Sequence, residues 1–339
     1  MGTRTTLAAL LLVALAAPAP TRAEPVTETL SSVEVPDPPR PRFGGTVVLE
    51  TSVGRGSFIR DEAARRPLAS LYVSARPEVR VARERALALG LAFDFDVNLV
   101  ENADSESTRP HQVRAGDLEL FARWDELATW EAGHLSFGAA LGVKTPTSLL
   151  SRFQTKILGL TASTATTWQP TEWLGVAWSF TVTKNINRYR SAVLRDDAFD
   201  LALPSRAGGA EVVAEGRTAT QLGVTSFLVG NALSLEFSFL DRFTASLGWE
   251  LVHAFSYNDY PKDALAADAA DGGRGRTDVM AGSIEVGVEV IEHLSVALGT
   301  LVQQAPKTAD NRHFRFPFWD TSNGADNRQV FYLDVTGTF

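Results

Sequence analysis

Two histidine–serine triplets are the residues best suited by type and spacing to nucleophilic chemistry. They are His134-Leu-Ser136 and His293-Leu-Ser295. A serine becomes a nucleophile when a histidine takes its proton and a third group orients that histidine. The flanking residues of the two triplets are alike, both triplets fall at predicted tight turns, and both serines point to the inner face of the strand that follows. We therefore interpret the triplets as a repeated turn element.

A second serine motif lies near the end of the chain. Ser322-Asn323-Gly324 resembles a fragment of the motif of outer-membrane phospholipases, but Asp320 stands where that motif has its histidine. This departure removes the base, so we interpret the segment as a turn. No metal-ligand spacing and no phosphate-cradling glycine loop is found in the sequence. We expect no catalytic residues, no cofactor and no metal, with a lipid hydrolase using Ser136 or Ser295 as the alternative.

Charged side chains that alternate with apolar ones are the other candidates. A strand turns successive side chains to opposite faces, so the charges of each segment share one face. We expect this face to line the lumen of a barrel, with the residues Arg76, Glu78, Arg80, Asp94, Asp96, Glu119, Arg123, Asp125, Lys144, Glu250, Glu285, Glu289 and Asp334.

The segment 87–99 shows the alternation most clearly. Its apolar face includes Leu89, Phe93 and Phe95, and its other face includes Asp94 and Asp96. An apolar face that no other element of the sequence would cover is typical of a sheet that meets lipid outside and water inside. The segment therefore predicts a transmembrane strand.

The same pattern recurs along the chain and predicts the fold class, an all-β, antiparallel up-and-down transmembrane β-barrel. Bacterial barrels of this kind have an even number of strands, and we count about 12. In 217–239 the apolar phase switches, which predicts a bulge near Gly230 and Asn231. The predicted strands are 46–53, 71–81, 85–101, 117–128, 135–145, 157–168, 174–186, 217–239, 243–255, 278–290, 294–302 and 328–339.

The connections and the two ends agree with a barrel in the outer membrane. Short and long connections alternate, as periplasmic turns and external loops do. Residues 1–23 are expected to be a signal peptide cleaved after Ala23, 24–43 a Pro-rich periplasmic leader, and 44–339 the barrel. The chain ends on Phe339, which resembles the signal read by the barrel-insertion machinery. The expected partners are therefore outer-membrane lipid, that machinery and a small-molecule solute.

Composition narrows the function classes. The chain has 32 Lys and Arg, 40 Asp and Glu and no Cys. An acidic chain argues against nucleic acid as a partner. The absence of cysteine means that an exported fold of this kind must be held by its hydrogen-bond ladder and not by disulfides.

Two interpretations of the charged lumen stay open. In one it is a solute path with an acidic bias. In the other it is closed, because Arg76, Arg80, Arg123 and Lys144 pair with carboxylates across it; isolated charges inside would be costly unless hydrated or paired.

A family resemblance adds a functional expectation. The stretch Gly116-Asp-Leu-Glu-Leu-Phe-Ala-Arg-Trp, followed by Leu141-Gly-Val-Lys-Thr-Pro-Thr147, resembles the porin-like family named for the meta-pathway of phenol degradation. Ser148 replaces the final glycine of that pattern. The resemblance implies an outer-membrane channel or transporter, with aromatic or hydrophobic compounds among the candidate solutes. A structural or adhesive barrel that binds through loop 187–216 is a further alternative.

Overall fold

The structure is a computed structural model that describes residues 42–54, 69–82, 87–99, 113–189, 191–195, 212–214, 217–240, 242–257, 275–308, 312–318 and 327–339. Most of these residues lie in strands. The predicted signal peptide (1–23) lies outside the described residues, and so does the predicted leader (24–43) apart from Arg42 and Phe43.

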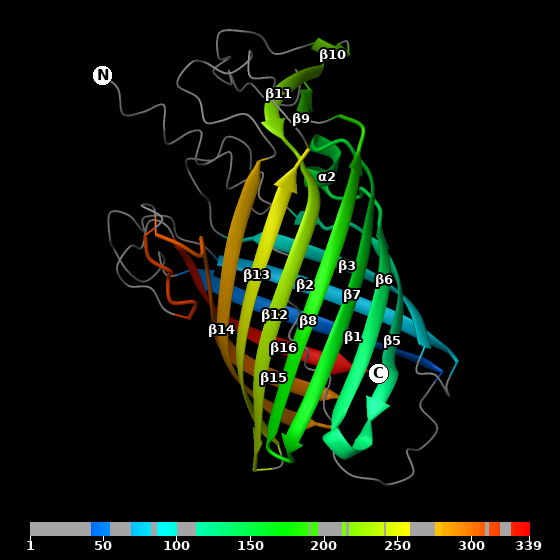
Figure 1. Ribbon diagram of the computed structural model, residues 1–339, viewed down its shortest axis with the longest axis vertical. Helices are drawn as coiled ribbons and strands as arrows, with labels where there is room; N and C mark the ends of the chain where they lie inside the picture. The colour runs from blue at the N-terminus through cyan, green and yellow to red at the C-terminus, as the bar shows by residue number, and fades with distance from the viewer. Residues whose placement is uncertain are drawn as a thin grey trace.

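The strands form a closed antiparallel barrel with 12 strands around its circumference (Figure 1). Strands that follow one another along the chain are hydrogen-bonded neighbours in the barrel. The fold class predicted from the alternation is therefore confirmed. β4 and β5 pair with successive parts of β3 and occupy one position in the ring. The strands are β1 (Phe43–Gly54), β2 (Ala69–Ala82), β3 (Leu87–Asn98), β4 (Val113–Ala115), β5 (Glu119–Trp130), β6 (Leu135–Lys144), β7 (Lys156–Thr171), β8 (Leu174–Asn187), β12 (Thr225–Phe239), β13 (Phe243–Ser256), β14 (Arg276–Ile291), β15 (Leu294–Gln304) and β16 (Asn327–Thr338).

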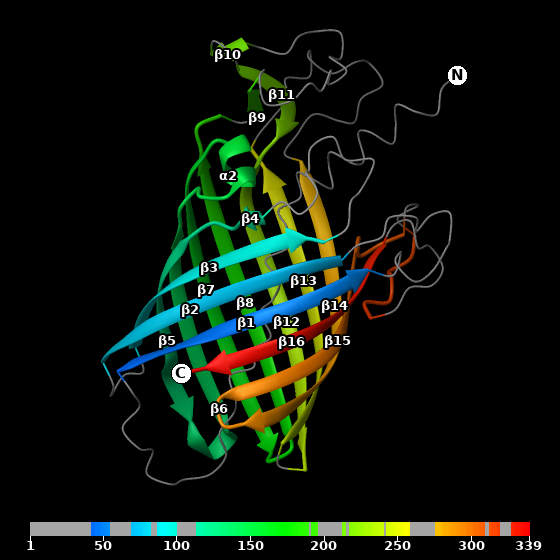
Figure 2. The same ribbon diagram turned by 180° about the vertical axis from the view of Figure 1, so that it is seen from behind.

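The barrel closes where the first strand meets the last. β1 pairs with β16 from Thr46 opposite Thr338 to Gly54 opposite Val330, and the two strands lie side by side in Figure 2. Beyond this ladder, the Gly45 N–H donates to the Phe339 carbonyl at 3.0 Å, and the Phe339 N–H donates to the Gly45 carbonyl at 3.1 Å. Closure leaves the barrel sheet without an unpaired edge.

The two faces of the sheet differ in chemistry and exposure. Glu50 and Asp334, which face each other across the seam, are both buried, whereas Leu89 and Leu298 on the opposite face are exposed. A closed sheet encloses one of its faces, so the buried polar face is the lumen and the exposed apolar face is the outer wall. Register pairs then assign each strand position to the inner or outer face.

Short elements lie at one end of the barrel. β9 (Ser191–Arg195), β10 (Val212–Ala214) and β11 (Arg217–Gly223) form a separate three-stranded sheet, at the same end as the one-turn helix α2 (Leu149–Phe153) (Figure 1). The helix is capped by Ser148, whose hydroxyl accepts a hydrogen bond from the Ser151 N–H at 3.0 Å. None of the helices in the described parts of the chain has the length and apolar composition to cross a bilayer.

The predicted strand 217–239 is two strands, and its predicted bulge near Gly230 and Asn231 is wrong. The register between β12 and β13 shifts between Thr225 and Phe227. Ser226 lies at this shift, is fully buried and accepts a hydrogen bond from Lys184 Nζ at 2.6 Å. Leu222 of the even apolar set belongs to β11 in another sheet, and Leu228 takes an inward position of β12, whose pairing around residue 230 is regular.

The two histidine–serine triplets occupy equivalent turns. His134 follows the one-turn helix η4 (Glu131–Gly133) and precedes β6, and His293 precedes β15. Both histidines have positive φ, 50° and 72°, in the left-handed region that ends a tight turn. The interpretation of these triplets as a repeated turn element is confirmed.

Candidate functional site

The charges of the lumen are divided between two parts of the wall. The inward positions from β2 to β7 carry both signs, and we call this part the mixed arc: Arg76, Glu78, Arg80, Asp94, Asp96, Arg114, Asp117, Glu119, Arg123, Asp125, Lys144 and Lys156. The inward positions of β12 to β16 and β1 form the acidic arc: Glu236, Glu250, Glu285, Glu289, Asp334 and Glu50. Among the side chains described on these six strands, no inward-facing Lys or Arg occurs.

One set of ion pairs in the mixed arc runs over β3. The Arg123 guanidinium donates to Glu78 Oε2 at 3.0 Å, and its Nε lies 2.8 Å from Asp125 Oδ1. Arg80 lies on the other side of Glu78, 3.8 Å from Oε1. The strand between β2 and β5 presents Gly90 inward at this level, and the ring of Phe121 occupies the place where a Cβ on Gly90 would be.

A second contact joins β4 to β3. Arg114 Nε donates to Asp96 Oδ2 at 2.9 Å, and the terminal nitrogen of the same guanidinium contacts the same oxygen. The carboxylate of the neighbouring inward residue, Asp94, fills the space beside Gly116. The break between β4 and β5 therefore lies in a charged part of the wall.

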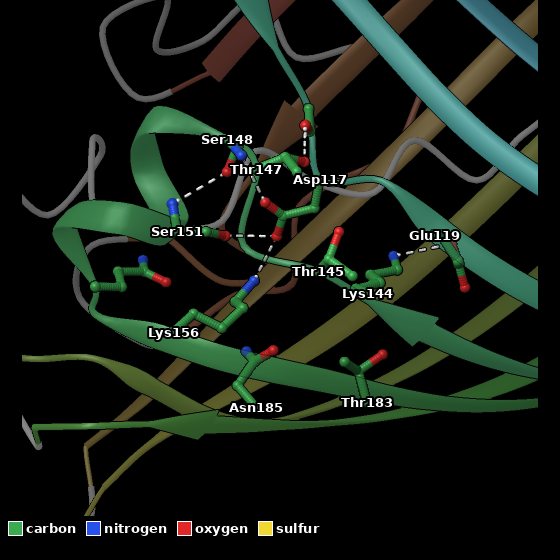
Figure 3. A network of polar contacts seen from close by, with 12 residues as sticks. Asp117, Glu119, Lys144, Thr145, Thr147, Ser148, Ser151, Lys156, Thr183 and Asn185 are labelled. Carbon is green, nitrogen blue, oxygen red and sulfur yellow. Dashed lines mark hydrogen bonds and ion pairs between the residues drawn. The ribbon is translucent and has the colours of Figure 1, made fainter.

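Asp117, within this break, binds three other parts of the polypeptide (Figure 3). Its Oδ1 accepts the Ser148 N–H at 3.0 Å, and its Oδ2 accepts Lys156 Nζ at 2.9 Å and the Ser151 hydroxyl. The side chains of Asp117 and Lys156 are each 11 % exposed. Hydrogen bonds to charged groups are stronger than neutral ones, so this carboxylate is a strong attachment point for α2 and the start of β7.

Threonine side chains reinforce the same attachment. The Thr147 hydroxyl accepts the Leu118 N–H at 2.8 Å and donates to the Gly116 carbonyl at 2.9 Å. The Thr145 N–H donates to the Leu118 carbonyl at 2.8 Å. Residues 145–148 are therefore held along residues 116–118 beyond the end of the β5–β6 ladder.

Lys144 and Glu119 form a looser pair beside this cluster (Figure 3). Lys144 Nζ lies 3.6 Å from Glu119 Oε2, which is beyond a normal hydrogen bond. The ammonium therefore keeps donor capacity that a solute could use. The Glu119 side chain lies flat against the wall because the neighbouring inward position is Gly142, where a Cβ would overlap its carboxylate.

The acidic arc includes carboxylates that lie at the same level of the barrel on neighbouring or nearby strands. The Tyr332 hydroxyl donates to Glu285 Oε2 at 3.0 Å, and Glu285 is 7 % exposed. Glu236 lies at the same level on β12, since both Glu236 and Glu285 pair with Ser246 of β13. Glu289 lies at the exposed end of β14. Two carboxylates at one level give this side of the lumen a concentrated negative charge.

The register places the predicted lumen residues on the enclosed face, and it adds others that the sequence did not reveal. Arg114 lies between the predicted strands 85–101 and 117–128, and Lys156 lies just before the predicted strand 157–168. Asp117 was expected at a strand end, where its contacts with residues 148–156 had no signal in the alternation. Glu50 and Glu236 have the correct parity in the sequence and were recoverable from it.

The serine chemistry gains no support from the geometry. The Ser136 hydroxyl is hydrogen-bonded to the Thr167 hydroxyl, across the β6–β7 ladder. His293 lies 3.5 Å from Glu292 and 3.4 Å from the Thr338 hydroxyl. Within the described ranges, no group of three or more His, Asp or Glu residues could hold a metal ion.

Comparisons with known proteins bear on the fold. No protein-family model and no curated protein matches the chain, so the resemblance to the phenol meta-pathway family stays a prediction. Among solved structures, an outer-membrane channel from Pseudomonas putida F1 aligns over 91 % of this chain and 100 % of its own, with 13 % identity and a TM-score of 0.51. The KdgM porin (8 % identity, 87 % and 99 % covered) and the NanC porin (7 %, 86 % and 98 %) have TM-scores of 0.41 and 0.43. The chain therefore shares its barrel fold with the Pseudomonas putida channel.

Proposed function

We propose that this chain is an outer-membrane, porin-like channel that lets small solutes cross the membrane through the barrel. The single observation that carries the proposal is the reversal of the two faces in a closed sheet. Large apolar side chains cover the outer wall, while carboxylates, guanidinium groups and ammonium groups lie inside. This distribution suits lipid outside and water inside.

The proposed orientation follows from the connections. The turns that carry His134 and His293 would face the periplasm together with both ends of the barrel, and the end with α2 and β9–β11 would face the outside. Phe339 would be read by the insertion machinery, and the signal peptide would direct export. The turn ends carry Trp130, Trp173 and Phe243 at exposed positions, which supports an interface with lipid headgroups there.

A solute path fits the ion pairs better than a closed lumen does. The contacts of Arg80, Arg114, Arg123, Lys144 and Lys156 given above join residues on the same strand, on adjacent strands or over one intervening strand or turn. They run along the wall and do not cross to the acidic arc. Such pairs stabilise the wall of the mixed arc.

Conductance of the purified barrel in a planar lipid bilayer tests the proposal. We expect discrete single-channel steps in potassium chloride and swelling of barrel-containing liposomes in small solutes, aromatic compounds included. A folded barrel that gives neither steps nor swelling contradicts the channel. If it also hydrolyses phospholipid, and Ser136→Ala or Ser295→Ala abolishes the hydrolysis, the lipid hydrolase is the better assignment.

A further inference from the structure

Part of the outer wall is covered by the chain itself. Register places Met280, Val302 and Gln304 on the outward face of β14 and β15, with Val302 opposite Gly282. Val302 is 1 % exposed and Gln304 is 4 % exposed, whereas Leu298 on the same face is 64 % exposed. Some element must therefore lie over the wall where β15 ends.

That element is the segment after β15. The carbonyl of Pro317 occupies the place where a Cβ on Gly282 would be, and the ring of Phe318 lies next to it. Gln304 Nε2 donates to the Phe316 carbonyl at 2.6 Å. We call residues 306–308 and 312–318 the outer shelf; they lie outside the barrel wall, in orange-red, in Figures 1 and 2.

The outer shelf has its own internal hydrogen bonds. Lys307 and Phe314 form a β-bridge, and the Thr308 N–H donates to the His313 carbonyl at 3.0 Å. The Arg315 N–H donates to the Pro306 carbonyl at 2.9 Å. These contacts fold the segment back on itself, so it forms a defined surface.

The surface that the outer shelf displays is aromatic and basic. Phe314 is 80 % exposed and Phe316 is 62 % exposed. Lys307 Nζ lies 5.2 Å from the centre of the Phe314 ring, and Arg312, two residues before Phe314, is exposed. Exposed rings next to basic side chains are the composition of protein surfaces that sit at a membrane interface, with rings among acyl chains and cations at lipid phosphates.

We propose that the outer shelf is a binding surface for a phosphorylated lipid of the outer leaflet. Phe314 and Phe316 enter the acyl region, and Lys307 and Arg312 contact the lipid phosphate. The outer shelf is continuous with the apolar wall below it, and its basic residues complement an anionic headgroup. The inference rests on the proposed outer-membrane location, because only there does the end of β15 meet an outer leaflet.

The position of the outer shelf in the bilayer can be measured with spin labels, because the chain contains no cysteine. Phe314→Cys and Phe316→Cys would each carry a nitroxide in a barrel reconstituted in nanodiscs. Val286→Cys on the uncovered wall and Glu292→Cys at the exposed opposite turn are the lipid and water controls. We expect the outer-shelf labels to resemble Val286→Cys, with high oxygen access and low access to a water-soluble nickel chelate.

The lipid preference is tested on the same nanodiscs by native mass spectrometry. We expect several-fold more phosphatidic acid than phosphatidylcholine to stay bound. The Lys307→Gln/Arg312→Gln variant should lose this preference, whereas Arg242→Gln, at the opposite end, should keep it.

Four results would overturn the proposal. In the first, the labels on the outer shelf are as accessible to the nickel chelate as the label at Glu292→Cys. In the second, the outer-shelf labels are protected only in nanodiscs that hold two barrels, which indicates that a second copy of the chain covers the outer shelf. The others are equal retention of the two lipids and displacement of phosphatidic acid by millimolar inorganic phosphate. Conductance recorded on the same samples separates this failure from failure of the channel, since the outer-shelf variants should conduct like the unaltered chain.

Discussion

The carboxylate of Asp117 connects the break between β4 and β5 to α2 and to β7. Lys156 is its charged partner, and both side chains are mostly buried. Removing one member of such a pair leaves the other without its counter-charge in a place that water reaches poorly. The energetic coupling between these two residues should therefore be large for a pair in a barrel wall.

A double-mutant cycle measures this coupling. We expect Asp117→Asn to lower the free energy of unfolding by about 2 kcal/mol, a typical cost for a lost charged hydrogen bond. In a chain that already carries Lys156→Met, the same change should cost clearly less. Urea unfolding in lipid vesicles measures the free energy of unfolding of each variant. If the changes caused by the two single substitutions sum to the change in the double variant within about 0.3 kcal/mol, the two residues act independently.

Gly142 controls where Glu119 lies. In Gly142→Ala the new methyl group would displace the flexible Glu119 carboxylate from the wall, and Lys144 would lose its partner. We expect normal folding and a small shift of the reversal potential in a salt gradient toward anions. If the change acts through Glu119, Gly142→Ala should have no further effect in a Glu119→Gln background; a further shift there would contradict this mechanism.

At the scale of elements, the outer shelf depends on a backbone approach that only glycine permits. Gly282→Ala places a Cβ against the Pro317 carbonyl, which is backbone and has little freedom to move. We expect residues 312–318 to lift from β14 and to be cleaved several-fold faster in limited proteolysis. Gly230→Ala is the matched control, because its nearest neighbours would be at 3.9 Å; equal cleavage of the two variants would rule out the close approach as the cause.

The sequence predicts strands better than the contacts between them. The alternation of 87–99 is enough to assign β3 and its faces, because period two is a local property. The division between β11 and β12 was not visible, since residues 217–223 and 225–239 are separated by one residue only and no turn signal marks the point where the chain passes to another sheet. The Asp117–Lys156 contact and the outer shelf could not be predicted from the sequence either. Each joins segments whose contact depends on the curvature of the wall and on the paths of the loops.

At the scale of the whole molecule, the two arcs set up an electric field across the lumen. The inward charged residues of the mixed arc carry both signs, whereas those described on the acidic arc are all carboxylates. Fixed negative charge raises the local concentration of cations in a confined space. We therefore expect the proposed channel to prefer potassium over chloride.

This preference should depend on the acidic arc. Glu236→Gln/Glu285→Gln should lower the potassium-to-chloride permeability ratio several-fold, because the amide at 285 still accepts the Tyr332 hydroxyl while the charge is gone. The effect should fade at about 1 M salt, where the screening length is about 3 Å. Reversal potentials give the ratio, and Glu292→Gln at the exposed turn is the control; an equal change in that variant would show that overall charge, and not the acidic arc, is responsible.

The seam between β1 and β16 also constrains how the molecule can be assembled. Thr46 pairs with Thr338 and Gly45 bonds Phe339, so the contacts that complete the ring join the two ends of the barrel and have the largest separations in sequence. Forming such a contact carries a large loop entropy and is slow. Until the barrel closes, β1 and β16 are edge strands whose unpaired backbone groups can pair with strands of other chains. The time that a nascent chain of this architecture spends open therefore determines its risk of aggregation.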